Sequence, residues 1–265
     1  MKTIKCYGKI NLSLNILGLR EDGYHFIDSI MMGVDLYDLV TAKKRNDEKI
    51  EIEFIGDGAE TIEYNNTVRK AVELLKREYG EFRGVDIVID KGLSIGGGLG
   101  GSAASAAGAL KAVGELYGLF FGEERFIELC RKLGSDAAFM GMLIERGYKF
   151  CARVRGVGEV IEEIENNLKM DILIERGRGG ASGDVYKAFD GLYRNGVFAP
   201  SDNDLLAEFL KAGDKRAVDY MNNGLESASI LLCKEIRGRI DALKNMSTIK
   251  VMVAGSGGSV WGIRE

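Results

Sequence analysis

Several residue types that serve common active sites are scarce in this chain. Its 265 residues include one histidine, His25, which excludes metal sites built from several histidines. A Ser-His-Asp triad would depend on that single residue, so we do not expect hydrolytic triad chemistry. The four cysteines, at positions 6, 130, 151 and 233, lack the paired spacing of zinc or redox sites. We therefore expect reduced and mostly buried thiols.

Long hydrophobic runs and a large excess of charge are also missing. No apolar run of roughly 18 residues appears, and residues 1–5 lead directly into a strand-like pattern without a signal peptide. The net charge of -4 and the pI of about 5.4 argue against a nucleic-acid interface. We predict a cytoplasmic protein with no membrane or nucleic-acid partner, as a monomer or homodimer. Its length suits one large or two ordinary domains.

Glycine, in contrast, is concentrated in one place. Residues 96–101 read Gly-Gly-Gly-Leu-Gly-Gly, and small residues at helical spacing follow from Ser102. Because glycine weakens helix and strand interiors, this density favours a loop whose backbone approaches a ligand at a helix start. The positive end of the helix dipole suits a phosphate, and Ser102 or Ser105 is a candidate helix cap. A tight turn before a closely packed helix is the simpler alternative.

Two familiar phosphate loops fit this stretch poorly. The Gly-Lys-Ser/Thr ending of P-loop NTPases is absent. Gly96-x-Gly98-x-x-Gly101 matches the dinucleotide fingerprint, but the preceding strand candidate, residues 85–90, carries acids on one face. A first Rossmann strand is buried on both faces and reads as continuously apolar. A nicotinamide-dependent oxidoreductase is therefore a weak alternative.

Strand-like and helix-like patterns both occur along the rest of the chain. Residues 9–16 place Lys9 and Asn11 on the polar face of a strand, a pattern also typical of a solvated face. Residues 39–41 and 50–55 predict a hairpin. Asp136 starts a later helix, where it would serve as a cap or a functional acid. The Gly-Ser-Gly-Gly turn at 255–258 is either a plain hairpin or a source of further backbone donors for phosphate.

Together these motifs resemble the GHMP small-molecule kinases. Residues 8–12, Gly-Lys-Ile-Asn-Leu, and 18–25, Gly-Leu-Arg-Glu-Asp-Gly-Tyr-His, are similar to the signature of the branch that acts on a cytidine-diphosphate-linked methylerythritol. Similar segments continue to residue 205, so the likeness covers nearly the whole chain. It implies a two-lobe α+β fold with the active site in the cleft. Residues 1–155 would form the ATP-binding domain, and residues 156–265 a smaller ferredoxin-like domain with its last helix and strand short or missing.

The resemblance also implies an activity and a set of site residues. The activity is Mg-ATP-dependent phosphorylation of the 2-hydroxyl of 4-diphosphocytidyl-2-C-methyl-D-erythritol, in non-mevalonate isoprenoid biosynthesis. Asp136 would accept or orient the hydroxyl proton, and Lys9 would keep that carboxylate charged and stabilise the transferring phosphoryl group. Magnesium would bridge the phosphates, its protein ligands being unknown. The implied binding residues are Asn11 and Ser182 for the substrate, Tyr24, His25 and Tyr186 for its cytosine, Asn66 for adenine, and Gly96, Gly97, Gly98, Leu99, Gly100, Gly101 and Ser102 for the ATP phosphates.

The chain departs from the family pattern in its loops. Ser94 replaces a proline, residues 102–105 read Ser-Ala-Ala-Ser in place of Gly-Ser-Ser-Asn, and residues 181–183 read Ala-Ser-Gly in place of Val-Ser-Thr. Which hydroxyl contacts phosphate or magnesium therefore stays open. Two rivals remain, a GHMP kinase for another alcohol such as homoserine or mevalonate, and a non-catalytic nucleotide-binding relative. The Gly-Tyr-His stretch argues against the first, and retention of Lys9 and Asp136 against the second.

Overall fold

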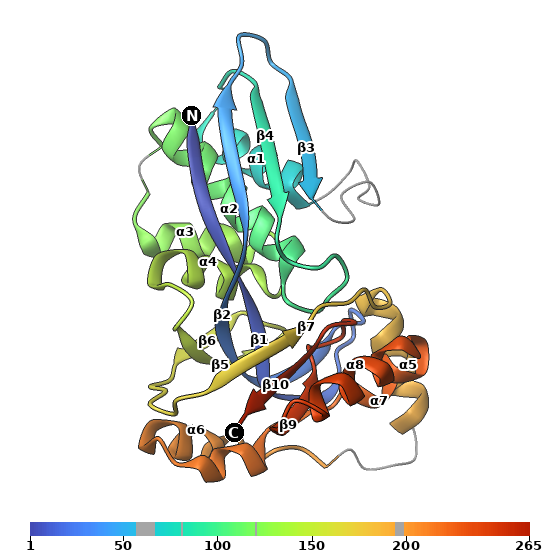
Figure 1. Cartoon of the computed structure of the whole chain (residues 1–265). Coiled ribbons are helices and arrows are strands. Elements are labelled where there is room, and N and C mark those ends of the chain that lie inside the picture. The colour runs from blue at the N-terminus through green and yellow to red at the C-terminus, as the bar shows by residue number, and fades with distance from the viewer. Residues whose placement is uncertain (57–66, 81, 120, 194–198) are drawn as a thin grey trace. The chain divides into compact units, whose positions relative to one another are not determined.

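The computed structural model describes residues 1–56, 67–80, 82–119, 121–193 and 199–265, and the chain packs as two compact units (Figure 1). Unit 1 comprises Met1–Gly8, Gly33–Ile95 and Gly100–Phe150, and unit 2 comprises Lys9–Met32, Gly96–Leu99 and Cys151–Glu265. The units are discontinuous because the long strands β1 (Lys2–Leu19) and β2 (His25–Lys44) each pass through both. The predicted division into domains at residue 155 stays a prediction, since both units are discontinuous along the chain.

Unit 1 is a sheet with helices packed against it. Its strands lie in the order β3, β4, β2, β1, with β3 spanning Ile50–Gly56 and β4 spanning Val85–Lys91. Helices α1 and α2 lie behind these strands in Figure 1. Alternate residues of β4 face the core, where Ile87 and Ile89 are almost completely buried. The helices of this unit are α1 (Thr67–Tyr79), α2 (Gly101–Tyr117), α3 (Glu123–Arg131) and α4 (Ala137–Arg146).

The hairpin predicted between residues 39–41 and 50–55 is wrong, because β4 lies between the two strands. Val40 on β2 pairs with Ile89 on β4 in an antiparallel ladder, and Ile52 on β3 pairs with Ile87 in a parallel one. The half-exposed strand β3 suits the edge of the sheet, whereas the more deeply buried β4 suits its interior. The antiparallel and parallel ladders on either side of β4 also differ from the all-parallel sheet of a dinucleotide-binding fold.

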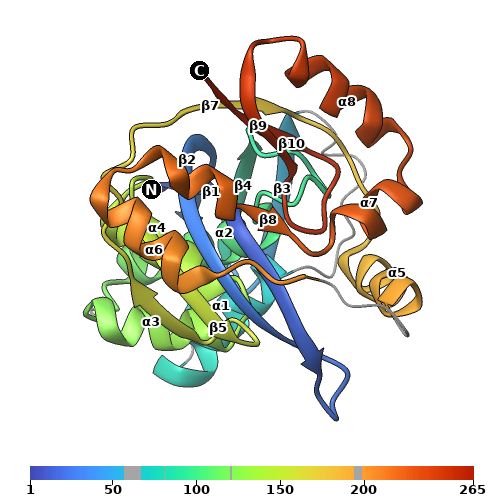
Figure 2. The same ribbon diagram turned by 90° about the horizontal axis from the view of Figure 1, so that it is seen from below.

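Unit 2 contains the other ends of β1 and β2 and a separate small sheet. Strand β8 (Asn222–Asn223) pairs with β1, while β5 (Cys151–Gly156) pairs with β2 and with β6 (Val160–Glu163). The small sheet is antiparallel, in the order β7 (Asp171–Glu175), β10 (Val260–Arg264), β9 (Thr248–Val253). Figure 2 shows α7 (Glu226–Leu232) and α8 (Glu235–Lys244) beside this sheet. Their shared core is Ile236, Leu243, Val253 and Val260.

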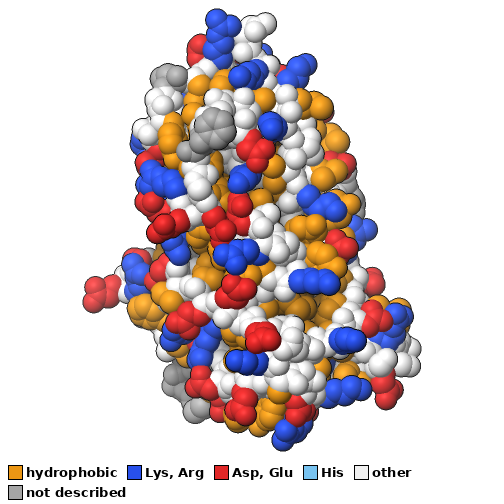
Figure 3. Space-filling view, turned by 90° about the vertical axis from the view of Figure 1, so that its left-hand side faces the viewer, with side chains coloured by type: hydrophobic (Ala, Val, Ile, Leu, Met, Phe, Trp, Pro, Cys, Tyr) orange, Lys and Arg blue, Asp and Glu red, His pale blue; other side chains and the backbone are white. Residues whose placement is uncertain are grey.

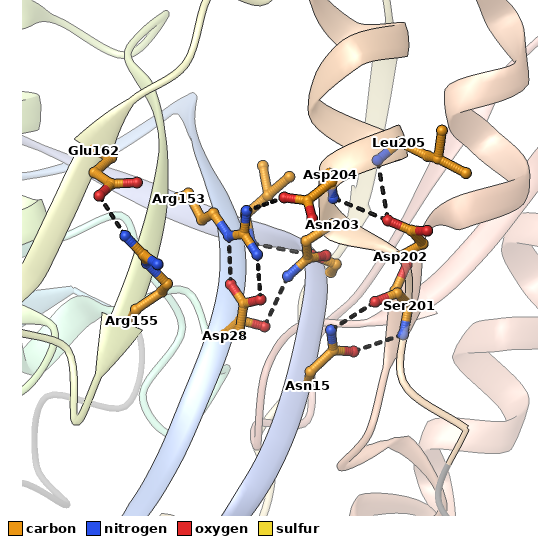
Figure 4. A network of polar contacts seen from close by, with 12 residues as sticks. Asn15, Asp28, Arg153, Arg155, Glu162, Ser201, Asp202, Asn203, Asp204 and Leu205 are labelled. Carbon is orange, nitrogen blue, oxygen red and sulfur yellow. Dashed lines mark hydrogen bonds and ion pairs between the residues drawn. The ribbon is translucent and has the colours of Figure 1, made fainter.

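A network of polar contacts joins α6 (Asn203–Ala212) to the strands of unit 2 (Figure 4). The Asn15 side chain donates to the Ser201 carbonyl at 2.9 Å and accepts from the Ser201 amide at 2.8 Å. Arg153 donates two hydrogen bonds to Asp28, at 2.8 and 2.7 Å. Burial is the largest single influence and raises the pKa of Asp28, but the hydrogen bonds from Arg153 and Asn203 and the charges of Arg153 and Arg155 together hold the pKa below its ordinary value. The family-like segment at residues 203–205 therefore has a structural role here.

The predicted state of the cysteines is confirmed. All four are free thiols, and Cys6, Cys130 and Cys151 are buried. Burial raises the pKa of the Cys151 thiol to about 12, so this thiol stays protonated and unreactive at neutral pH.

The surface in Figure 3 carries positive and negative side chains in close mixture. This agrees with the small net charge of -4. Among the helices that the structure describes, none has the length and apolar character needed to cross a membrane.

Candidate functional site

The polar face of β1 is buried in unit 2, which excludes the solvated face that the sequence also allowed. Lys9 and Asn11 are 5% and 1% exposed. The Lys9 ammonium donates to Asn11 Oδ1 at 2.7 Å, and Asn11 Nδ2 donates to Ser29 Oγ at 2.8 Å. Ser29 Oγ in turn donates to the Ser13 carbonyl at 2.5 Å. Because buried polar groups are costly unless hydrogen-bonded, this chain fixes where the Lys9 ammonium lies.

Three glycine-containing segments of unit 2 meet near Lys9. They are residues 96–99, residues 177–180 and residues 255–258, which we call the glycine cluster. The Gly96 carbonyl accepts hydrogen bonds from the amides of Gly179 and Gly258, both at 3.0 Å. The Lys9 amide donates to the Leu99 carbonyl at 3.0 Å. The turn at 255–258 is thus more than a hairpin, since it is bonded to the loop that the sequence assigned to phosphate.

Close packing in the glycine cluster explains the glycines at positions 98 and 257. A Cβ atom added at Gly98 would lie 1.7 Å from the Ala254 carbonyl oxygen, and one at Gly257 would lie 2.0 Å from the Gly98 nitrogen. A Cβ at Gly255 would lie 3.3 Å from the Lys9 ammonium and 3.2 Å from Asn11 Oδ1. The backbone of Gly255 therefore lies close to the buried Lys9 ammonium, with no side chain of residue 255 between them.

Ser182 also reaches this cluster. It is the first residue of α5 (Ser182–Tyr193), and its hydroxyl forms a short hydrogen bond with the Ser256 hydroxyl in the turn at 255–258. The structure thus brings Lys9, Asn11, Ser182 and residues 96–99 together in unit 2. Their roles in binding remain predictions.

The proposed base-reading residues lie elsewhere in unit 2. The His25 and Tyr186 rings stack directly, with centroids 4.8 Å apart and planes inclined by 28°. His25 Nε2 lies 2.8 Å from Asp190 Oδ1, a partner that sequence reasoning missed. Tyr24 is 59% exposed. His25 and Tyr186 were expected to flank a cytosine, but the two rings stack on each other and leave no room for a base between them in this arrangement.

In unit 1 the glycine loop continues into α2. The helix is capped by Gly100, in a left-handed conformation with φ 81°, and neither Ser102 nor Ser105 serves as the cap. That expectation was wrong because glycine alone adopts this backbone geometry easily. Ser102 is exposed and its hydroxyl lies 2.9 Å from the Thr67 hydroxyl, whereas Ser105 is buried. Of the two serines, Ser102 is therefore the better candidate for a phosphate or magnesium contact.

Asp136 belongs to unit 1 and occupies the position before α4, but its carboxylate makes no capping hydrogen bond. The simple structural explanation for this acid, that it caps a helix, is therefore not supported. Asn66, predicted to lie near adenine, falls outside the described residues. Among the described residues no group of three or more His, Cys, Asp or Glu side chains forms a metal site.

Sequence reasoning underestimated the segment at 177–180. It was expected only as a glycine-rich loop, although its Gly-Arg-Gly-Gly composition is the signal that would have joined it to the other two segments. Arg239 reinforces the cluster, because its guanidinium donates to the Gly258 carbonyl at 2.9 Å.

Comparison with known proteins identifies the family of this chain. Residues 66–142 match the family described as GHMP kinases N terminal domain. The chain is 31% identical over 262 residues to the 4-diphosphocytidyl-2-C-methyl-D-erythritol kinase of Caldicellulosiruptor saccharolyticus, covering 98% of this chain and 87% of that relative. It is 33% identical over 266 residues to the kinase of the same name from Alkaliphilus metalliredigens, with the same coverage of 98% and 87%.

Solved structures share the mixed α+β fold over the whole chain. A crystal structure of 4-(cytidine 5'-diphospho)-2C-methyl-D-erythritol kinase has a TM-score of 0.72 at 24% identity, covering 99% of this chain and 90% of that one. Homoserine kinase from Cytophaga hutchinsonii has a TM-score of 0.66 at 15% identity, covering 99% and 85%. Mevalonate kinase from L. major has a TM-score of 0.68 at 15% identity, covering 99% and 87%. The chain belongs to the GHMP kinase superfamily, whose members are ATP-dependent phosphotransferases acting on small molecules.

Proposed function

We propose that this kinase phosphorylates the 2-hydroxyl of 4-diphosphocytidyl-2-C-methyl-D-erythritol. The observation that carries the proposal is the aromatic pair of His25 and Tyr186, backed by Asp190, in the same unit as Lys9 and the glycine cluster. A kinase for a small aliphatic alcohol needs no stacking surface, whereas a cytidine substrate does. Curated relatives of that activity, at 31% and 33% identity, support the same choice.

In this proposal the glycine cluster and Lys9 bind phosphate. Backbone N–H groups at residues 96–102 contact the ATP phosphates, and the Lys9 ammonium stabilises the charge that builds up on the transferring phosphoryl group. Asn11, which accepts the Lys9 hydrogen bond, orients Lys9 and contributes its amide to the substrate hydroxyls. The lack of a Cβ atom at Gly255 leaves backbone beside the Lys9 ammonium, which supports a role in phosphate binding. Magnesium, when bound, neutralises phosphate charge, and Ser102 is the hydroxyl of this loop best placed to contact either.

Asp136 supplies the carboxylate that accepts or orients the proton of the attacking hydroxyl. Phosphoryl transfer depends mainly on alignment and charge stabilisation, so a weak but well-placed base is sufficient. In this proposal residues 1–155 form the ATP-binding domain, and the reaction belongs to non-mevalonate isoprenoid biosynthesis.

The direct test is the release of ADP from Mg-ATP in the presence of 4-diphosphocytidyl-2-C-methyl-D-erythritol, homoserine or mevalonate. We expect turnover with the cytidine compound alone. Equal or faster turnover with homoserine or mevalonate would reject the proposed substrate. Binding of Mg-ATP without turnover on any of the three would instead support the non-catalytic alternative.

Removing the aromatic ring of Tyr186 is expected to raise KM for the cytidine substrate about tenfold, since stacking of a base on an aromatic ring contributes roughly 1–3 kcal/mol. KM for ATP should change less than about twofold. The measurement is steady-state kinetics of Tyr186→Ala beside Tyr193→Ala. The control removes a tyrosine of the same helix whose ring lies against Phe189 in a tilted arrangement, with centroids 4.7 Å apart. Equal effects of Tyr186→Ala on both KM values would remove this residue from the base site.

A further inference from the structure

A buried ion pair lies beneath the start of α2 in unit 1. Asp38, on β2, is completely buried, and it forms a short ion pair with Lys91, at the end of β4, whose side chain is 5% exposed. The other carboxylate oxygen of Asp38 accepts hydrogen bonds from the amides of Gly92 at 3.0 Å and Leu93 at 2.8 Å. The pair therefore holds the residues that lead toward the glycine loop.

The same pair contacts the helix that follows the loop. Ser105 Oγ lies 3.1 Å from Asp38 Oδ2, 3.5 Å from the Lys91 ammonium and 2.9 Å from the Gly101 carbonyl. A Cβ atom added at Gly101, the first residue of α2, would lie 3.2 Å from that ammonium. The network thus links the backbone before the loop, at residues 92–93, to the backbone after it, at residues 101–105.

Desolvation makes a fully buried ion pair weak as a source of stability, so its placement calls for another explanation. Ser105 also stands where the family loop carries asparagine, one of the departures of this chain. We propose that Asp38, Lys91 and Ser105 are positioning residues that hold the start of α2 and thereby set the affinity for nucleotide phosphates. The inference rests on the proposed phosphate role of residues 96–102, and it extends that role to side chains that contact no phosphate.

Two variants and a matched control separate positioning from general stabilisation. Ser105→Ala removes the link to α2 and leaves the ion pair in place, whereas Asp38→Asn removes the charge of the pair. The control is Glu145→Gln, which removes the negative charge from the 2.6 Å ion pair between Lys111 of α2 and Glu145 of α4. All three changes weaken contacts of unit 1, but only the first two act on the backbone around the loop.

The experiment measures the Kd for Mg-ADP by calorimetry on each full-length variant, with urea unfolding beside it. We expect Kd to rise about tenfold in Ser105→Ala, as loss of a hydrogen bond to a charged group implies, and further in Asp38→Asn. KM for the alcohol should stay within about twofold in both, and Glu145→Gln should leave Kd unchanged.

An unchanged Kd in folded Ser105→Ala would overturn the proposal, and so would an equal rise in Glu145→Gln. Should Asp38→Asn fail to fold, Ser105→Ala decides, because it keeps both charges paired. Binding of Mg-ADP to the wild type is measured first, and its absence would reject the phosphate role of the loop itself. Failure of the methylerythritol assay alone leaves this nucleotide-binding test intact.

Discussion

Asp136→Asn is expected to lower kcat at least about a thousandfold, within the range that a lost general base or proton acceptor produces. The amide cannot accept the hydroxyl proton and carries no negative charge to pair with a cation. Because asparagine has nearly the same shape, the Kd for Mg-ATP should stay within about twofold. Single-turnover ADP formation and nucleotide titration on the same preparation measure the two quantities.

The matched control is Asp202→Asn, an identical substitution at the start of another helix. Asp202 caps α6 by accepting hydrogen bonds from the amides of Asp204 and Leu205, both at 3.1 Å. Asparagine caps a helix as well as aspartate does, so this variant should keep wild-type kcat. Asp136 makes no such bond at α4, which is why we expect the two substitutions to differ. Near-normal turnover in Asp136→Asn would reject its role as the base.

Local patterns in the sequence predicted most of the strands and helices, because each depends on spacing along one segment. The alternation at residues 9–16 correctly predicted a strand. The glycine-rich run at residues 96–101 correctly predicted a loop that leads into a helix. The alternation of polar and apolar residues does not tell which strands pair with one another in the sheet. The placement of β4 between β2 and β3 depends on contacts between segments about 40 residues apart, so the predicted hairpin failed.

The candidate site shows the same limit. Lys9, Asn11 and the loop at 96–99 were each singled out from sequence motifs, and the structure brings them together in unit 2. Whether the polar face of β1 is solvated or buried could not be read from alternation, since both cases place polar residues at every second position. Asp38 and Lys91 were missed for a related reason. Asp38 lies within β2 and Lys91 ends β4, and only the pairing of β2 with β4 makes them neighbours.

Gly98→Ala is expected to abolish most nucleotide binding, because the segments of the glycine cluster can no longer pack against one another. The Kd for Mg-ATP should rise at least about a hundredfold. The new methyl group would lie 1.7 Å from the Ala254 carbonyl oxygen, so the backbone of one segment must move. Gly98 also has φ 78°, a left-handed conformation that costs a non-glycine residue about 1–2 kcal/mol. Overpacking adds about 1–3 kcal/mol, so urea unfolding should show a loss of about 2–5 kcal/mol.

Gly96→Ala separates the loss of stability caused by left-handed backbone strain from the loss caused by overpacking. Gly96 has a similar φ of 66°, but its nearest neighbour lies 3.4 Å from the added Cβ. Its unfolding free energy should fall by only the left-handed strain, about 1–2 kcal/mol. Gly122→Ala, with φ -68° and nothing within 4 Å of the added Cβ, should change neither stability nor binding. If Gly98→Ala lost no more stability than Gly96→Ala, the contact with Ala254 would not constrain the loop. The packing of residues 96–99 against the turn at 255–258 would then not be required for phosphate binding.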